Sequence, residues 1–77
     1  MKLTISKIDK VLWSGEATSV TVPSRDGVIT ILAHHMPLIT TLKEGEVKVV
    51  CEGKQDQIIP IESGFLEVGK QETVILL

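Results

Sequence analysis

The feature that most constrains this chain is an alternation of apolar and polar residues with a period of two. Leu3 and Ile5 begin the pattern, and Ile29 and Ile31 resume it around Thr30. Successive side chains of a β-strand point to opposite faces, whereas a helix needs apolar residues three and four positions apart. No window of the sequence sustains that helical spacing. The pattern therefore predicts an all-β chain.

Turn-forming residues separate the alternating segments. Asp26-Gly27 predicts the close of a β-hairpin, because glycine adopts positive φ at no steric cost. Further breaks are expected at Glu44-Gly45, Glu52-Gly53-Lys54, Ser63-Gly64 and Gly69-Lys70-Gln71. Short strands at close intervals favour a sandwich or barrel, and the high apolar content favours two facing sheets. We expect one domain over residues 1–77.

Two prolines refine this expectation. Pro60 cannot donate a ladder hydrogen bond, so its strand is predicted to lie at an edge or to carry a bulge. Pro37 biases Met36 away from the helical region. The segment from Ala33 to Thr41 is therefore predicted to be an ordered connection that crosses between the sheets. Trp13 is interpreted as an anchor of the core or its edge, with a docking anchor as the alternative.

Composition excludes several function classes. The 77 residues carry a formal net charge of −2 with both signs interspersed. Such a chain lacks the basic stripe that phosphate binding requires and the aromatic platforms that bind single strands. No apolar run reaches the roughly 18–20 residues that span a bilayer, and no signal-peptide core is present. An intracellular location is therefore expected. Cys51 is the only cysteine, so an internal disulfide is impossible, which fits a reducing compartment.

The residues that could carry chemistry do not form a recognisable site. His34 and His35 point opposite ways in an extended chain, and no further ligand completes a metal site. We expect one of them to be hydrogen-bonded and the other to face a partner. Cys51 lies beside Glu52, which disfavours a thiolate, so a structural cysteine is expected. Since no phosphate loop or nucleophile elbow is present either, the sequence predicts a docking domain, not an enzyme.

Four segments resemble one family. They are Leu12-Trp13-Ser14-Gly15-Glu16, the stretch from Asp26-Gly27 to Leu32, the stretch from His35-Met36-Pro37-Leu38 to Gly45, and Ser63-Gly64-Phe65-Leu66-Glu67-Val68. The last two are similar to "GHAPLLTALKPG" and "GGFLEV" of the epsilon subunit of the bacterial rotary ATP synthase, called delta in mitochondria. The match covers essentially the whole chain. Where the family has Gly, Pro and Gly in "LGILPGH", this chain has Thr30, Ala33 and His34.

The resemblance implies a β-sandwich of about ten short strands without the C-terminal helical hairpin that usually follows. It implies a non-catalytic central-stalk subunit of a proton-transporting ATP synthase that couples c-ring rotation to the gamma subunit and the catalytic hexamer. Its partners would be gamma and the polar loops of the c-ring, with no cofactor, metal, bound nucleotide or nucleic acid. Its place would be peripheral, on the cytoplasmic face of the bacterial plasma membrane. The helix-borne inhibition of ATP hydrolysis would be missing.

The same resemblance suggests where partners bind. The predicted contact residues are Arg25, Asp26, Gly27, Val28, His35, Met36, Leu42 and Glu44. The first four match the ring-facing loop, and the others match positions that shape the fold or lie near gamma. The alternative is a lipoyl- or biotinyl-like carrier domain or another small all-β interaction module. Lys54 and Lys70 lie at turns, as a carrier lysine would, but neither has the flanking residues of a carrier motif.

Overall fold

The computed structural model describes residues 1–77 and contains nine strands and no helix. The strands are β1 (Lys2–Lys7), β2 (Lys10–Glu16), β3 (Ser19–Ser24), β4 (Gly27–Leu32), β5 (Leu38–Leu42), β6 (Gly45–Val50), β7 (Gln57–Ile61), β8 (Gly64–Val68) and β9 (Glu72–Leu76). The all-β prediction is confirmed, with nine strands where about ten were expected.

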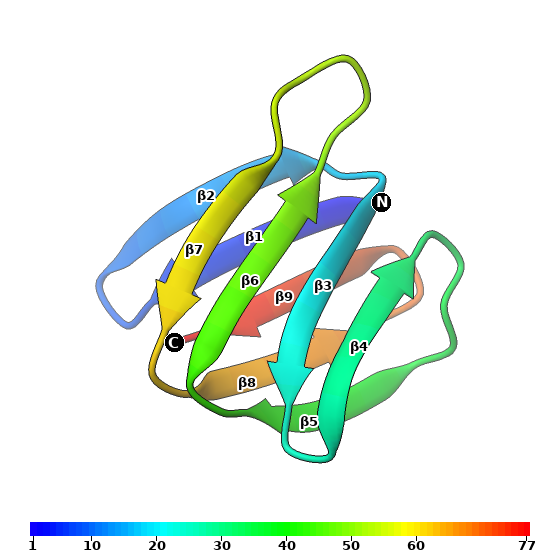
Figure 1. The fold of residues 1–77 in the computed structure, drawn as a ribbon. Coiled ribbons are helices and arrows are strands. Elements are labelled where there is room, and N and C mark those ends of the chain that lie inside the picture. Colours follow the sequence, from blue (N-terminus) through cyan, green and yellow to red (C-terminus); the bar gives the residue numbers. More distant parts are fainter.

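The strands form two facing layers, as Figure 1 shows. One layer has the order β4-β3-β6-β7 and the other has the order β5-β8-β9-β1-β2. A single ladder position, where Ser24 lies opposite Leu42, joins β3 to β5 and makes the hydrogen-bonded path continuous. The β-sandwich is therefore one continuous sheet folded over itself, and the sheet bends where β3 meets β5.

The core lies between the layers and is built by the alternation seen in the sequence. Leu3 and Ile5 of β1 and Val20 and Val22 of β3 are fully buried, while Thr4 and Thr21, which lie between them, are only partly buried. The complete cluster holds 14 buried residues: Leu3, Ile5, Ala17, Val20, Val22, Ile31, Leu42, Val47, Val49, Cys51, Ile61, Leu66, Val68 and Ile75. Most are β-branched, and such side chains pack well on a pleated surface.

The predicted hairpin and edge strand are both present. β3 pairs antiparallel with β4 from Ser19 opposite Leu32 to Ser24 opposite Gly27. The two-residue turn is Arg25-Asp26, and Gly27 follows it with φ 134°. Pro60 lies in β7, which pairs only with β6 and ends the sheet order. An edge position tolerates proline because its missing N–H is not needed by a second neighbour.

The crossing connection is shorter than predicted. Residues 33–37 connect β4 in one layer to β5 in the other, as Figure 1 shows. Leu38 to Thr41 were predicted to lie in this connection but belong to strand β5, which pairs with β8. Pro37 lies directly before β5, where its missing N–H interrupts no ladder. His34 has φ 65°, the left-handed region, at a position where the family resemblance has glycine.

One pairing was not expected from the sequence. β1 pairs in parallel with β9, with Lys2 opposite Glu72 and Ile5 opposite Ile75. The first and last strands therefore lie side by side in the centre of the larger layer. Local patterning carries no information about this contact, because the two strands are separated by most of the chain.

Candidate functional site

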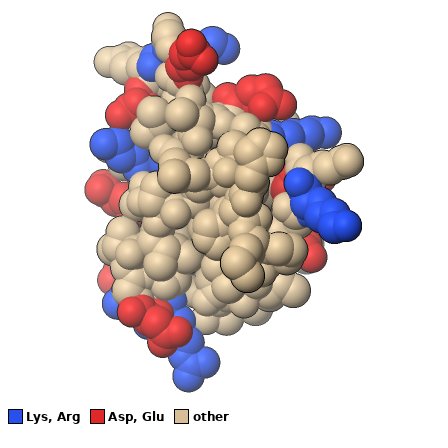
Figure 2. Space-filling model, turned by 90° about the vertical axis from the view of Figure 1, so that its right-hand side faces the viewer, with Lys and Arg blue, Asp and Glu red and all other residues tan.

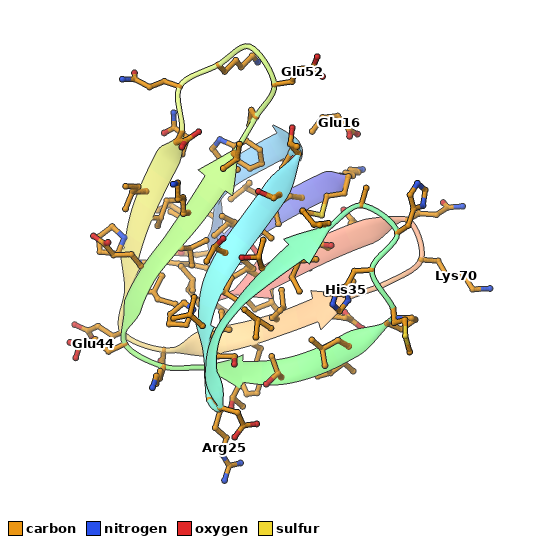
Figure 3. The ribbon with its side chains drawn as sticks, turned by 45° about the vertical axis from the view of Figure 1, so that its right-hand side comes forward. Glu16, Arg25, His35, Glu44, Glu52 and Lys70 are labelled. Carbon is orange, nitrogen blue, oxygen red and sulfur yellow. The ribbon has the colours of Figure 1, made fainter.

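The β3–β4 turn holds four of the residues predicted to contact a partner. Arg25, Asp26 and Val28 are exposed, and Gly27 is partly buried. The turn is tied to its base by the Ser24 hydroxyl, which donates to the Gly27 carbonyl. It is tied to β5 by the Arg25 N–H, which donates to the Thr41 carbonyl at 3.0 Å. These bonds hold a short, two-residue tip at one end of the sandwich (Figure 3).

The β5–β6 corner carries the next two predicted residues. Glu44 is exposed and projects from this corner (Figure 3). Leu42 is only 4% exposed and belongs to the core. The sequence left open whether this position shapes the fold or lies near a partner, and its burial gives it the first role. Leu42 is therefore corrected from a contact residue to a core residue.

His35 and Met36 lie at the opposite end of β4 from the Arg25-Asp26 tip. Five extended steps separate Gly27 from Leu32, about 17 Å at the usual rise of about 3.4 Å per residue. Both side chains are exposed, and His35 Nδ1 donates to the Met36 carbonyl at 2.7 Å. The hydrogen-bonded histidine is confirmed, while a partner for the other histidine stays a prediction. The predicted residues thus do not form one compact cluster.

The segment that follows the β3–β4 turn and runs through His35 and Met36 to β5 has no charged side chain. Residues 27–42, which include β4, the connection and β5, contain no Lys, Arg, Asp or Glu. Figure 2 views this side of the molecule and shows charged side chains only around its rim. We call the exposed side chains of residues 27–42 the uncharged face. Its large apolar members are Val28, Leu32, Met36 and Ile39, which are 71%, 57%, 78% and 72% exposed.

Leu32 and Ile39 were not among the predicted contacts. The signal for them was present as the longest charge-free run of the sequence. Phe65 of β8 also extends this surface, because it lies opposite Thr41 of β5 and is exposed. A shallow depression connects the tip to this region and is lined by Arg25, Asp26, Ile39, Thr40, Thr41 and Phe65. Exposed apolar surface, where it is contiguous, marks interaction sites.

The remaining residues singled out in the sequence have structural positions. Cys51 is buried in the core cluster, as expected of a structural cysteine. Trp13 is partly buried and packs against the core, and its ring lies against Gly15. The core-edge interpretation of Trp13 is therefore confirmed. Lys54 and Lys70 are exposed at their loops, and Lys70 is labelled in Figure 3.

The ionisable residues are dispersed. No three side chains among His, Cys, Asp and Glu lie close enough together to hold a metal ion. Three ion pairs are present, including Lys48 with Asp56 at 3.6 Å on the surface. Every buried side-chain nitrogen and oxygen has a hydrogen-bond partner. The structure holds no helix with the length and apolarity that crossing a membrane requires.

Comparison with known proteins identifies the family of this chain. The family model described as ATP synthase, Delta/Epsilon chain, beta-sandwich domain matches residues 1–77. The chain is 39% identical to the ATP synthase epsilon chain of Chlorobium limicola over 75 residues, which are 97% of this chain and 85% of that protein. It is 37% identical to the epsilon chain of Dichelobacter nodosus, but spans only 48% of that protein.

Solved structures agree on the fold. A chain in the Euglena gracilis mitochondrial ATP synthase, described as OSCP/F1/c-ring, matches with a TM-score of 0.88 and 25% identity. The match covers 96% of this chain and 48% of that one. A chain from the central stalk/c-ring of the Tetrahymena thermophila mitochondrial ATP synthase matches with a TM-score of 0.82 and 12% identity, covering 97% of this chain and 60% of that one. The second likeness is one of fold alone.

Proposed function

Because this chain belongs to the family of ATP synthase delta/epsilon chain β-sandwich domains, we propose that it is a central-stalk subunit of a proton-transporting ATP synthase. In this role it binds the gamma subunit and the polar loops of the c-ring, and so couples ring rotation to the catalytic hexamer. The observation that carries the proposal is the family match over residues 1–77. The relatives are epsilon chains, and a carrier domain has no support among them.

The proposed task is mechanical and non-catalytic. Torque passes between subunits through rigid packed contacts, and a sandwich with a closely packed hydrophobic core resists deformation. The chain then needs no cofactor, metal or nucleotide of its own. We take residues 1–77 as one epsilon-type domain, located peripherally at the cytoplasmic face of a bacterial plasma membrane through the complex.

We assign gamma to the uncharged face, and with it Val28, which the family resemblance matched to the ring-facing loop. Docking there removes Val28, Leu32, Met36 and Ile39 from water without stripping hydration from any charged side chain. Burial of these apolar side chains against gamma also stabilises a domain of this size, since a short chain buries only about 60% of its unfolded surface on folding alone. The Arg25-Asp26 tip is assigned to the c-ring loops, because a charged tip suits polar loops.

Co-purification tests the gamma assignment. The chain and gamma from the same synthase are expressed together, and the complex is recovered through a tag on gamma. Val28→Asp is expected to weaken binding about tenfold or more, because it places a charge in an apolar contact. Ile58→Asp is the matched control, since Ile58 is 56% exposed on β7, away from the uncharged face. Failure of wild type to bind gamma overturns the proposed function.

Disulfide cross-linking tests the c-ring assignment. Asp26→Cys, in a Cys51→Ala background, is expected to cross-link to cysteines in the c-ring polar loops of the assembled synthase. Lys54→Cys in the same background is the control, because the β6–β7 loop lies at the end of the sandwich opposite the tip (Figure 1). Equal cross-linking from both positions would contradict the assignment.

A further inference from the structure

Three strands of the sandwich pair with a single neighbour: β2, β7 and β4. Natural edge strands are usually protected from pairing with other chains by charges, proline or bulges. β2 carries Lys10 and Glu16 and a register shift at Val11–Trp13. β7 carries Pro60. β4, with the sequence GVITIL, carries none of these protections.

The order of hydrogen-bonded and non-hydrogen-bonded pairs in the β3–β4 hairpin identifies the backbone groups that β4 leaves unpaired. The two-residue turn makes Ser24 and Gly27 the first hydrogen-bonded pair of the hairpin. The next pair, Pro23 with Val28, is then non-hydrogen-bonded, which suits a proline without an N–H. The Pro23 carbonyl indeed points away from β4, because it accepts from the Lys43 N–H at 2.9 Å.

Hydrogen-bonded and non-hydrogen-bonded pairs alternate along the β3–β4 ladder. The N–H and C=O groups of Val28, Thr30 and Leu32 therefore point away from β3. Of these groups, only the Leu32 carbonyl has a partner elsewhere in the chain, the His35 N–H at 3.2 Å. Val28 and Thr30 therefore present a row of free donors and acceptors. The row lies on β4, one of the segments that form the uncharged face.

We infer that β4 is a pairing edge at which an extended strand of gamma adds to the β4-β3-β6-β7 layer. This inference rests on the proposed function and specifies how gamma binds. An added strand satisfies the free groups of Val28 and Thr30 and lays its side chains beside Val28, Thr30 and Leu32. The part of that strand that lies beside β4 is uncharged, because β4 itself has no charged side chain to compensate a buried ion.

The occupant is gamma and not a second copy of this chain. Two copies paired through β4 alone contribute six residues each, whereas a stable interface uses about 20–30 residues a side. The β4 edge is instead continuous with the face already assigned to gamma, so a gamma strand extends an interface that has other contacts.

Amide hydrogen exchange on the labelled chain tests the inference residue by residue. In the free protein the amides of Val28 and Thr30 are expected to exchange quickly, and those of Ile29 and Ile31 slowly. In the complex with gamma, Val28 and Thr30 are expected to slow at least tenfold. A complex in which both amides still exchange quickly overturns the inference but leaves the proposed function intact. Protection of both amides in dilute protein without gamma, through self-association, overturns the inference in favour of a second copy.

A pair of variants gives an independent test. Thr30→Pro removes the outward N–H and Thr30→Ala keeps it, while both remove the hydroxyl that pairs with Thr21 at 2.9 Å. Thr30→Pro is expected to weaken gamma binding about tenfold relative to Thr30→Ala. Equal binding by two folded variants contradicts strand addition. If Thr30→Pro does not fold, the exchange measurement on wild type decides. If wild type forms no complex with gamma, the proposed function and this inference fall together.

Discussion

Gly64 of β8 lies directly against the backbone of Leu76 in β9. A Cβ added at Gly64 would lie 2.7 Å from the Leu76 carbonyl oxygen and 2.9 Å from the Leu77 side chain. The oxygen cannot easily move, because β9 is held between β8 and β1. Gly64 is thus required for close approach of two strands, and its backbone has no unusual φ.

Gly64→Ala is accordingly expected to destabilise the chain by about 1–3 kcal/mol, the usual cost of forcing extra atoms into a packed site. Chemical denaturation followed by Trp13 fluorescence measures the change. Ser63→Ala, at an exposed neighbouring position, should leave the midpoint nearly unchanged. Equal stability of both variants would show that the strands separate at no cost.

His34 offers a stabilising substitution. It is the one residue other than glycine with positive φ, at 65°, and a side chain there costs about 1–2 kcal/mol relative to glycine. Glycine loses more entropy on folding, so His34→Gly is expected to raise the free energy of unfolding by about 0.5–1 kcal/mol.

The control for His34→Gly is Ala33→Gly, next to it in the same connection. Ala33 has no positive φ, so glycine there is expected to lower stability by about 0.5–1 kcal/mol. Thermal unfolding of the two variants should therefore shift in opposite directions. A shift in the same direction would contradict the strain assigned to His34.

Ile31 and Leu32 are adjacent in β4 but should have separable roles. Ile31 is fully buried and Leu32 is 57% exposed on the uncharged face. Ile31→Ala is expected to cost about 2–5 kcal/mol of stability through the cavity it leaves. Leu32→Ala should change stability by less than about 0.5 kcal/mol but weaken gamma binding. Unfolding and binding measurements on both variants check this, and a destabilising Leu32→Ala would contradict it.

The unprotected β4 edge predicts that the free chain self-associates at high concentration. Thr30→Lys places a charge on this edge and is expected to reduce association, as lysine does on natural edge strands. Ile58→Lys on β7 is the control, because Pro60 already protects that edge. Light scattering over a concentration series measures the effect. Equal suppression by both lysines would mean that β4 is not the associating strand.

The sequence predicted the local features of the fold well. Alternation identified the buried residues of β1, β3 and β4. Turn chemistry predicted the β3–β4 hairpin, although it placed the turn at Asp26-Gly27, one residue after the observed Arg25-Asp26 turn. The missing N–H of Pro60 predicted its edge position. Contacts between distant segments were not predictable in this way. The parallel β1–β9 ladder and the β3–β5 corner depend on how the layers close, and no local pattern records that.

The candidate site was predictable only in part. The family resemblance pointed to the tip and to His35-Met36, both of which are exposed. It also pointed to Leu42, whose side chain the layers bury. Leu32 and Ile39 were not predicted, although the charge-free run of the sequence contains both, because alternation does not say which exposed apolar side chains contact a partner.

The affinity of the chain for gamma of the same synthase, measured for wild type, Val28→Asp and Ile58→Asp, tests the proposed function most directly. The proposed function predicts a stable wild-type complex, binding at least about tenfold weaker for Val28→Asp, and binding close to wild type for Ile58→Asp. No wild-type complex, or equal effects of the two substitutions, would contradict it.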